Sequence, residues 1–108
     1  MTTSSTALSR AILFLEEFRK IDPEMPMHTA LLFLLIAREP GINLKRLSHL
    51  TGLGKSVVSR NIALLSEEYG KGLVYYREDP VDRRNKMLFV TAAGERVTQT
   101  LAGLVGEA

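Results

Sequence analysis

Two short groups of residues have the types and spacing expected of a surface that contacts a polyanion. The first group recurs on one side of residues 55–69 if these form a helix: Lys55, Ser56, Ser59 and Arg60. An arginine can bond a guanine edge or grip a phosphate, serines can reach bases or phosphates, and a lysine at a helix start can hold a phosphate. This pattern predicts a recognition helix in the major groove of double-stranded DNA, whereas a helical hairpin with a polar outer face is the structural alternative.

The second group is the basic run from Asp82 to Lys86, where Arg83, Arg84 and Lys86 place three cations within four residues. An arginine side chain is stabilised in a narrow minor groove, because the negative potential there is enhanced. A neighbouring aspartate can orient the guanidinium group of that arginine. A solvated charged loop is the alternative. The position of the run, shortly after the candidate recognition helix, favours contact with DNA.

The helix Lys55–Tyr69 needs a partner that aims its polar face outward. Val58, Ile62 and Leu65 recur at helical spacing and predict its buried side. A short helix, Leu44–Thr51, precedes it, and Gly52 supplies the left-handed backbone that a tight turn between two helices often needs. Asn43 is the expected cap of the short helix, and Gly70 and Gly72 are expected to end the long one.

The remaining pattern predicts a mainly α protein with a small β-hairpin (α+β), in the order of a winged helix-turn-helix. Residues 1–5 are expected to form a disordered tail, and residues 6–108 a single winged-helix domain. Besides the two helices above, the expected elements are helices Thr6–Ile21, Pro26–Glu39 and Ala92–Val105, and strands Leu73–Glu78 and Lys86–Thr91 joined by a turn at Asp79–Asp82. The second helix is apolar on all sides between Ala30 and Ala37, which predicts a central buried position.

Composition argues against several function classes. The chain of 108 residues has no cysteine, so thiolate metal sites, cysteine nucleophiles and disulfides are excluded. His28 and His49 are far apart with no third ligand at useful spacing, and no catalytic triad or phosphate-binding glycine loop occurs. We therefore expect no enzyme activity, no metal and no cofactor. A polar start and no apolar run of membrane-spanning length predict a cytoplasmic location.

Charge is unevenly distributed along the chain. The segment from Lys45 to Lys86 contains nine basic and five acidic residues, whereas the rest of the chain contains five basic and seven acidic residues. A basic half beside an acidic half favours one face that meets a polyanion. Chance clustering on a solvated surface explains the charge alone about equally well.

From Met27 to Leu104 the sequence resembles the MarR family of bacterial winged-helix transcription regulators. The carriers are the buried 31–36 segment with Pro40-Gly41, the Leu47-Ser48…Gly52-Leu53 pair, and Ser56-Val57-Val58-Ser59-Arg60. The most specific carrier is the tip Asp79-Pro80-Val81-Asp82-Arg83-Arg84. The resemblance implies a homodimeric regulator of transcription, a repressor, on a roughly palindromic site. It also implies that Arg84 reaches the minor groove, that Asp82 braces Arg84, and that Arg83 touches phosphate.

Three departures from the family pattern change what we expect. The chain ends at Ala108, where the family usually continues into long dimer helices, so we expect a reduced dimer interface built from Thr6–Ile21 and Ala92–Val105. Its apolar residues would be Leu8, Ala11, Ile12, Leu15 and Phe18, beside the row Ala7, Phe14 and Ile21, with Val97, Leu101 and Leu104. The stretch from Leu65 to Gly72 is three residues longer than usual, which predicts a longer recognition helix. Gly54 stands where a serine cap is usual, and glycine is a weaker cap.

Two other functions are compatible with the sequence. One is a DNA-binding accessory in replication or partition, and the other is a winged helix that binds only proteins. The sequence does not indicate a small-molecule effector, an operator or a set of regulated genes.

Overall fold

A computed structural model describes residues 5–68 and 70–106. The elements follow in the order α1 (Ser5–Ile21), α2 (Met27–Arg38), α3 (Leu44–Thr51), α4 (Lys55–Leu65), β1 (Val74–Glu78), β2 (Lys86–Val90) and α5 (Ala92–Leu104). The strands pair antiparallel with Val74 opposite Val90 and Glu78 opposite Lys86, and they form the wing. The predicted α+β winged helix-turn-helix is therefore confirmed. Residues 1–4 of the expected tail lie outside the described residues, whereas Ser5, its last residue, is the first residue of α1.

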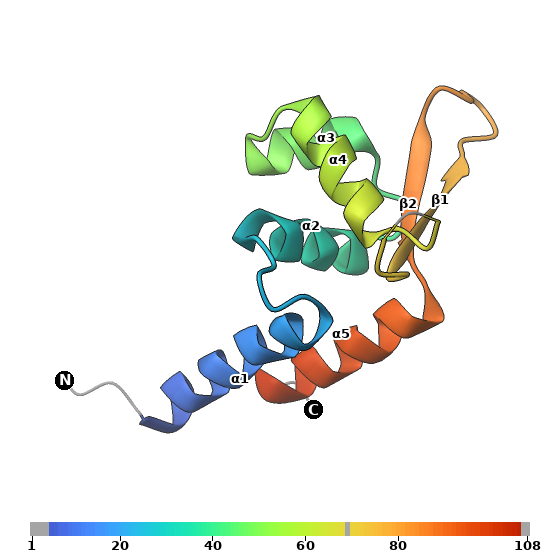
Figure 1. Ribbon diagram of the computed structural model, residues 1–108. Helices are drawn as coiled ribbons and strands as arrows, with labels where there is room; N and C mark the ends of the chain where they lie inside the picture. The colour runs from blue at the N-terminus through green and yellow to red at the C-terminus, as the bar shows by residue number, and fades with distance from the viewer. Residues whose placement is uncertain (1–4, 69, 107–108) are drawn as a thin grey trace.

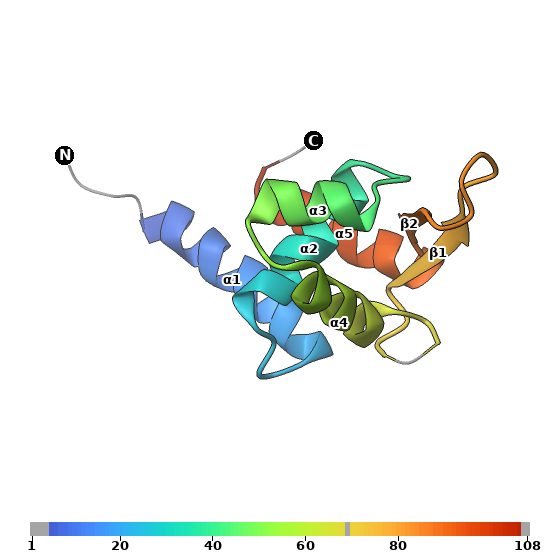
Figure 2. The ribbon, with the colours of Figure 1, turned by 90° about the horizontal axis from the view of Figure 1, so that it is seen from above.

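The molecule has two ends. Helices α3 and α4 and the wing tip lie at one end, and α1 packs along α5 at the other, with α2 between them (Figure 1). Viewed from above, the hairpin projects on one side and the start of α1 on the opposite side (Figure 2). This arrangement separates the surface that bears the candidate site from the surface that bears α1.

Helix α2 is the centre of the core, as its apolar sequence predicts. Its Leu32, Phe33 and Ile36 have no measurable exposure, and Phe33 meets Phe18 of α1 edge to face with ring centroids 6.0 Å apart. Its N-cap is Pro26, which has extended backbone and needs no N–H there. The core continues through α3, α4, the wing and α5, so one hydrophobic cluster holds all the elements in place.

The side of α1 that packs is narrower than the apolar arc in its sequence. Phe18 is buried, and Phe14 and Ile21 pack against the core. Leu8, Ile12 and Leu15, about one third of a turn away around the helix, remain 53–60% exposed. The core therefore packs against the side of α1 that carries Phe14, Phe18 and Ile21. The stripe formed by Leu8, Ile12 and Leu15 stays uncovered.

The expected extension of the recognition helix is wrong. Helix α4 ends at Leu65, because Ser66 is extended and bridges Val74 of β1. The Leu73 N–H donates to the Leu65 carbonyl at 2.9 Å, which ties the following loop back to the helix end. Pairing with the wing is a tertiary interaction that the local sequence did not indicate. Tyr69, the expected last residue of the helix, lies outside the described residues.

Residues 70–73 instead turn back and bond to residues 64–66 at the end of the helix. The Gly70 N–H donates to the Ser66 carbonyl and the Lys71 N–H to the Leu64 carbonyl, each at 3.0 Å. A Cβ on Gly70 would lie 1.9 Å from the Leu64 carbonyl oxygen, so no other residue fits without moving the backbone. Gly70 and Gly72 therefore shape this loop and do not end the helix.

Candidate nucleic-acid interface

Helix α4 is positioned by a turn that its neighbours fix with hydrogen bonds. Gly52 adopts φ +76°, the left-handed conformation predicted for it. The Ser48 hydroxyl donates to the Leu53 carbonyl at 2.5 Å, and the Thr51 hydroxyl accepts from the Leu53 N–H at 3.1 Å. Ser48, one of the residues that carry the family resemblance, therefore also stabilises the turn. The Asn43 side chain accepts from the Arg46 N–H at 2.8 Å and caps α3 as expected.

A buried polar pair sets α4 against α2. The Thr29 hydroxyl donates to the Asn61 side-chain carbonyl, and both residues are at most 5% exposed. The Asn61 amide donates in turn to the Val57 carbonyl at 2.8 Å. Val58, Ile62 and Leu65 are buried beside them, which confirms the predicted inner side of the helix. The orientation of α4 is therefore fixed by apolar contacts and by one directional polar contact.

With that side buried, the predicted contact residues face solvent. Lys55, Ser56, Ser59 and Arg60 are all exposed. Gly54 is the N-cap without a side-chain cap, so first-turn N–H groups of α4 are open to an anion, close to Lys55. The arrangement is a cationic and hydroxyl-bearing helix face with the width that a major groove accepts.

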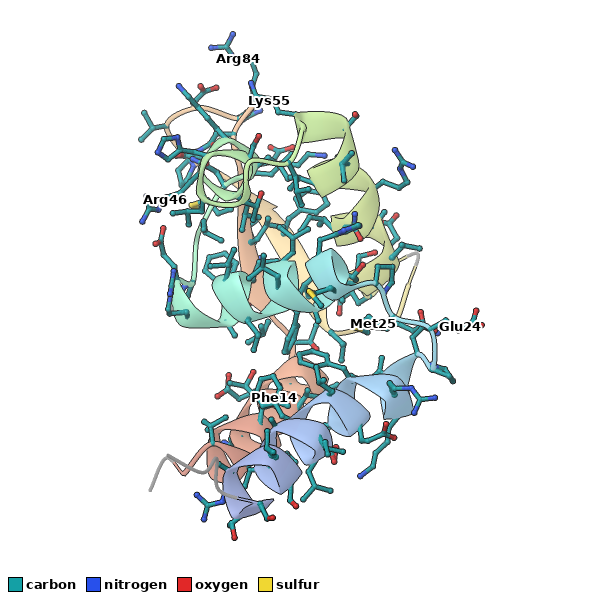
Figure 3. All side chains as sticks on the ribbon, turned by 90° about the vertical axis from the view of Figure 1, so that its left-hand side faces the viewer. Phe14, Glu24, Met25, Arg46, Lys55 and Arg84 are labelled. Atoms are coloured by element: carbon teal, nitrogen blue, oxygen red, sulfur yellow. The ribbon has the colours of Figure 1, made fainter. Side chains whose placement is uncertain are left out.

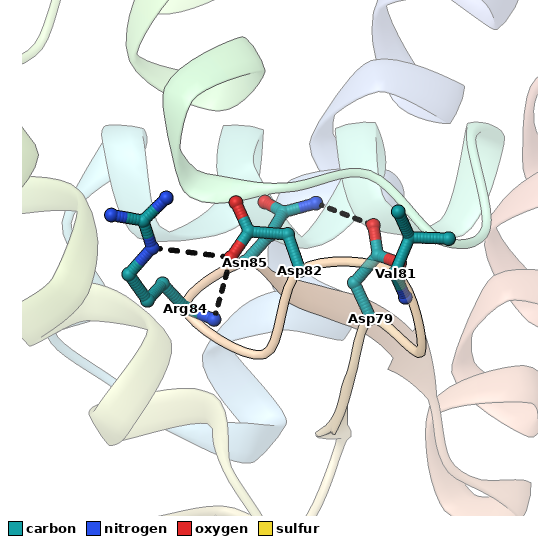
Figure 4. Close-up of polar contacts among 5 residues, drawn as sticks. All are labelled: Asp79, Val81, Asp82, Arg84 and Asn85. Atoms are coloured by element: carbon teal, nitrogen blue, oxygen red, sulfur yellow. Dashed lines mark hydrogen bonds and ion pairs between the residues drawn. The ribbon is translucent and has the colours of Figure 1, made fainter.

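The wing tip carries the second predicted group. The Arg84 guanidinium Nε donates to Asp82 Oδ1 at 3.2 Å, and the Arg84 backbone N–H donates to the same oxygen at 3.1 Å (Figure 4). The Arg84 side chain is 92% exposed although it is paired. Asp82 therefore binds the backbone N–H and the Nε of Arg84, and the two terminal guanidinium nitrogens stay available to bind a ligand. Arg83 and Lys86 are also exposed.

The two groups lie at the same end of the molecule. Figure 3 shows Arg84 and Lys55 together at the end opposite Phe14 of α1. Between α4 and the hairpin runs an open groove of about 780 Å³, to which Ser59 contributes from the helix and Lys86 from the wing. The Lys86 ammonium lies 4.5 Å from the centroid of the Tyr76 ring, which keeps this cation beside the groove. A continuous surface thus runs from the helix to the wing.

Sequence reasoning missed the residues that close the wing tip. The Asp79 carboxylate accepts from the Val81 N–H at 2.8 Å and from the Asn85 side-chain amide at 3.0 Å. These two hydrogen bonds, the first above all, hold the pKa of Asp79 below its usual range. The signal was present, because an aspartate before proline often accepts a hydrogen bond from the backbone two residues on.

An ion pair also joins α3 to the end of α2. Arg46 Nε lies 2.6 Å from Glu39 Oε2, which lowers the pKa of Glu39 and raises that of Arg46. Both side chains are more than one-third exposed, so the pair contributes little to stability. It engages Arg46, one of the nine basic residues between Lys45 and Lys86.

Other kinds of site have little support. The described residues contain no group of three or more potential metal ligands among His, Asp and Glu. In the same part of the chain, no helix combines the length and apolar character that crossing a bilayer needs.

The chain matches known proteins by structure and not by sequence. No protein-family model and no curated protein sequence matches the chain. Solved structures do match. The structure of MarR superimposes with a TM-score of 0.69 at 26% identity, over 93% of this chain and 70% of that one. A MarR transcriptional regulator from Methanosarcina mazei gives 0.67 at 25% identity, over 93% and 75%. FabT from Streptococcus pneumoniae, solved in complex with DNA, gives 0.67 at 16% identity, over 88% and 66%.

These matches establish the architecture. The chain has the MarR-like winged-helix fold and spans about two thirds to three quarters of the length of these regulators. The Methanosarcina mazei protein is a transcriptional regulator, as are SlyA and PcaV, whose structures also match, and this agrees with the expectation that the chain is not an enzyme.

Proposed function

We propose that this chain is a DNA-binding transcription regulator that inserts α4 into the major groove and the wing tip into the adjacent minor groove. The observation that carries the proposal is that Lys55, at the start of the exposed α4 face, and Arg84 of the wing tip lie at the same end of the molecule (Figure 3). A protein with this fold has been solved on DNA, and another is named for its role in transcription. The proposal assigns the same class of ligand to this surface.

On α4, the length and position of each side chain decide which part of the DNA it contacts. Arg60 is long enough to form two hydrogen bonds with a guanine edge, and Ser56 and Ser59 contact base edges or phosphates nearby. Lys55, beside the open N-terminus of α4, holds a phosphate and fixes the register of the helix. Arg60 therefore carries sequence discrimination and Lys55 carries affinity.

On the wing, Arg84 enters the minor groove and Arg83 and Lys86 hold phosphates on its sides. The Asp82–Arg84 pair supports this role because it preorganises a long side chain that is otherwise free in solvent. Readout at this position depends on groove width, so a narrow A·T-rich segment is the expected target.

The opposite end of the molecule supplies a dimer surface. Leu8, Ile12 and Leu15 form the uncovered stripe on α1, and Val105 near the end of α5 is 61% exposed. A second copy of the chain covers these residues with its own stripe, as an isologous interface requires. Two copies then present two copies of α4 to a palindromic site, and occupancy of such a site in a promoter represses transcription.

The test begins with selection of genomic fragments by the purified chain, followed by affinity measurements on the selected duplex. Binding should weaken steeply with salt, log K falling by about 0.9 per phosphate neutralised for each unit of log salt. Arg84→Ala should weaken binding by roughly tenfold or more, and Arg60→Ala should reduce the preference for the selected duplex over unrelated DNA. Arg96→Ala is the matched control, since Arg96 is an exposed arginine on α5.

Three results would each overturn the proposal or part of it. If the chain passes through a DNA column without retention at low salt, its winged helix is a protein-interaction module. If Arg84→Ala and Arg96→Ala have equal affinities for the selected duplex, the wing does not contact DNA. Fragments recovered from replication origins and not from promoters would indicate a role in replication or partition.

A further inference from the structure

The wing tip has a second layer of hydrogen bonds below the Asp82–Arg84 pair. Asp79 Oδ1 accepts from the Val81 N–H at 2.8 Å, and Asp79 Oδ2 accepts from the Asn85 side-chain amide at 3.0 Å (Figure 4). The Asp79 backbone N–H donates to the Asn85 carbonyl at 2.9 Å. One residue therefore contacts both ends of the loop that carries Arg84.

We propose that Asp79 is a positioning residue for DNA binding, which keeps the wing tip closed so that Arg84 is presented to the minor groove in one orientation. The inference rests on the proposed function of the wing. Asp79 acts through Asn85, the residue next to Arg84 in the chain, and does not itself contact DNA. This role is separate from that of Asp82, which contacts Arg84 directly.

The tip needs such an anchor because apolar packing does not hold it. Val81 is 96% exposed, and Asp82, Arg83 and Arg84 are exposed as well. A loop without buried side chains is ordered mainly by its hydrogen bonds, and a disordered loop loses conformational entropy when it binds. A closed tip has already lost that entropy before DNA arrives.

The charge of Asp79 makes the test decisive, because electrostatics and positioning predict opposite changes in DNA affinity when the side chain is removed. A carboxylate near a polyanion repels it, so removal of the negative charge of Asp79 would by electrostatics alone strengthen DNA binding. Removal of its acceptor oxygens would weaken binding if the inference is correct. Asp79→Ala and Asp79→Asn remove the same charge, but only the asparagine keeps an acceptor for the Val81 N–H and an amide that can pair with Asn85.

The experiment compares Asp79→Ala, Asp79→Asn, Asn85→Ala and Arg84→Ala in the full chain on the selected duplex. We expect Asp79→Ala to bind about five- to tenfold more weakly than the wild type, the scale of one or two lost hydrogen bonds. Asp79→Asn should bind within twofold of the wild type or more tightly. Thermal midpoints should fall by no more than about 5–8 °C, the equivalent of the one or two lost hydrogen bonds, so every variant stays folded at the temperature of the binding assay.

A double variant distinguishes positioning from a general structural effect. If Asp79 acts through Arg84, Asp79→Ala combined with Arg84→Ala should bind no more weakly than Arg84→Ala alone. Equal affinities of Asp79→Ala and Asp79→Asn, with Arg84→Ala clearly weaker than the wild type, would overturn this inference and leave the proposed function standing. A wild-type affinity for Arg84→Ala would overturn the wing contact itself, and a wild-type chain that binds no duplex would overturn both.

Discussion

Thr29→Val tests how α4 is held against α2, because it removes one buried hydroxyl with almost no change of volume. In the folded chain the Thr29 hydroxyl donates to the Asn61 side-chain carbonyl, and the two residues are 3% and 5% exposed. Valine leaves that carbonyl oxygen buried without its donor. The Asn61 amide still donates to Val57, so the change isolates one hydrogen bond.

The magnitude follows from the cost of a buried acceptor without a partner. Loss of the partner costs about 1–3 kcal/mol in the free energy of unfolding, whereas exchange of both partners for apolar groups is close to neutral. For a chain of this length, 1 kcal/mol corresponds to about 4 °C in the thermal midpoint. We therefore expect Thr29→Val to lower the midpoint by about 4–12 °C.

Urea denaturation at one fixed protein concentration, with Asn61→Leu and the double variant beside Thr29→Val, completes a double-mutant cycle. The double variant should lose less stability than the sum of the single variants, by about 1–2 kcal/mol. If the losses add and Thr29→Val unfolds within about 0.3 kcal/mol of the wild type, the pair does not hold α4, and apolar contacts alone must position it.

Three further predictions concern other parts of the chain. Gly70→Ala should destabilise the fold by about 2 kcal/mol or more, because the added Cβ would meet the backbone of Leu64. Gly103→Ala should stabilise the fold by about 0.5–1 kcal/mol, because Gly103 lies in α5 with open space at its Cβ position. Urea titrations that rank the two variants the other way would contradict the loop geometry. The stability from the Glu39 ion pair is complete above the ordinary carboxyl pKa of 4.5 and is lost as the pH falls through the lowered folded-state pKa, so Glu39→Gln should slightly reduce the acid dependence of the thermal midpoint below about pH 4.5. An unchanged profile would show that the pair contributes nothing measurable to stability. Ile12→Asp should dissociate the proposed dimer in sedimentation velocity, and Leu13→Asp, a similarly exposed apolar residue on another side of α1, should not; equal association of both variants would place the interface elsewhere.

Local patterns in the sequence were sufficient for most of the fold. The spacing of Val58, Ile62 and Leu65 fixed which side of α4 is buried, because helical periodicity leaves a single apolar side. Gly52 and Asn43 have conformational and capping preferences of their own, so the turn and the start of α3 were predicted correctly. The resemblance in the Asp79–Arg84 tip also predicted the contact between Asp82 and Arg84.

The end of α4 and the choice of side on α1 were decided only in the tertiary structure. Leu65 is the last helical residue because Ser66 pairs with Val74, a partner eight residues ahead that no helical propensity can anticipate. The apolar arc of α1 is wider than one contact needs, so its sequence allowed either side to pack, and the position of Phe33 on α2 selected Phe18. In both places the local free-energy differences are small and contacts from distant residues determine the outcome.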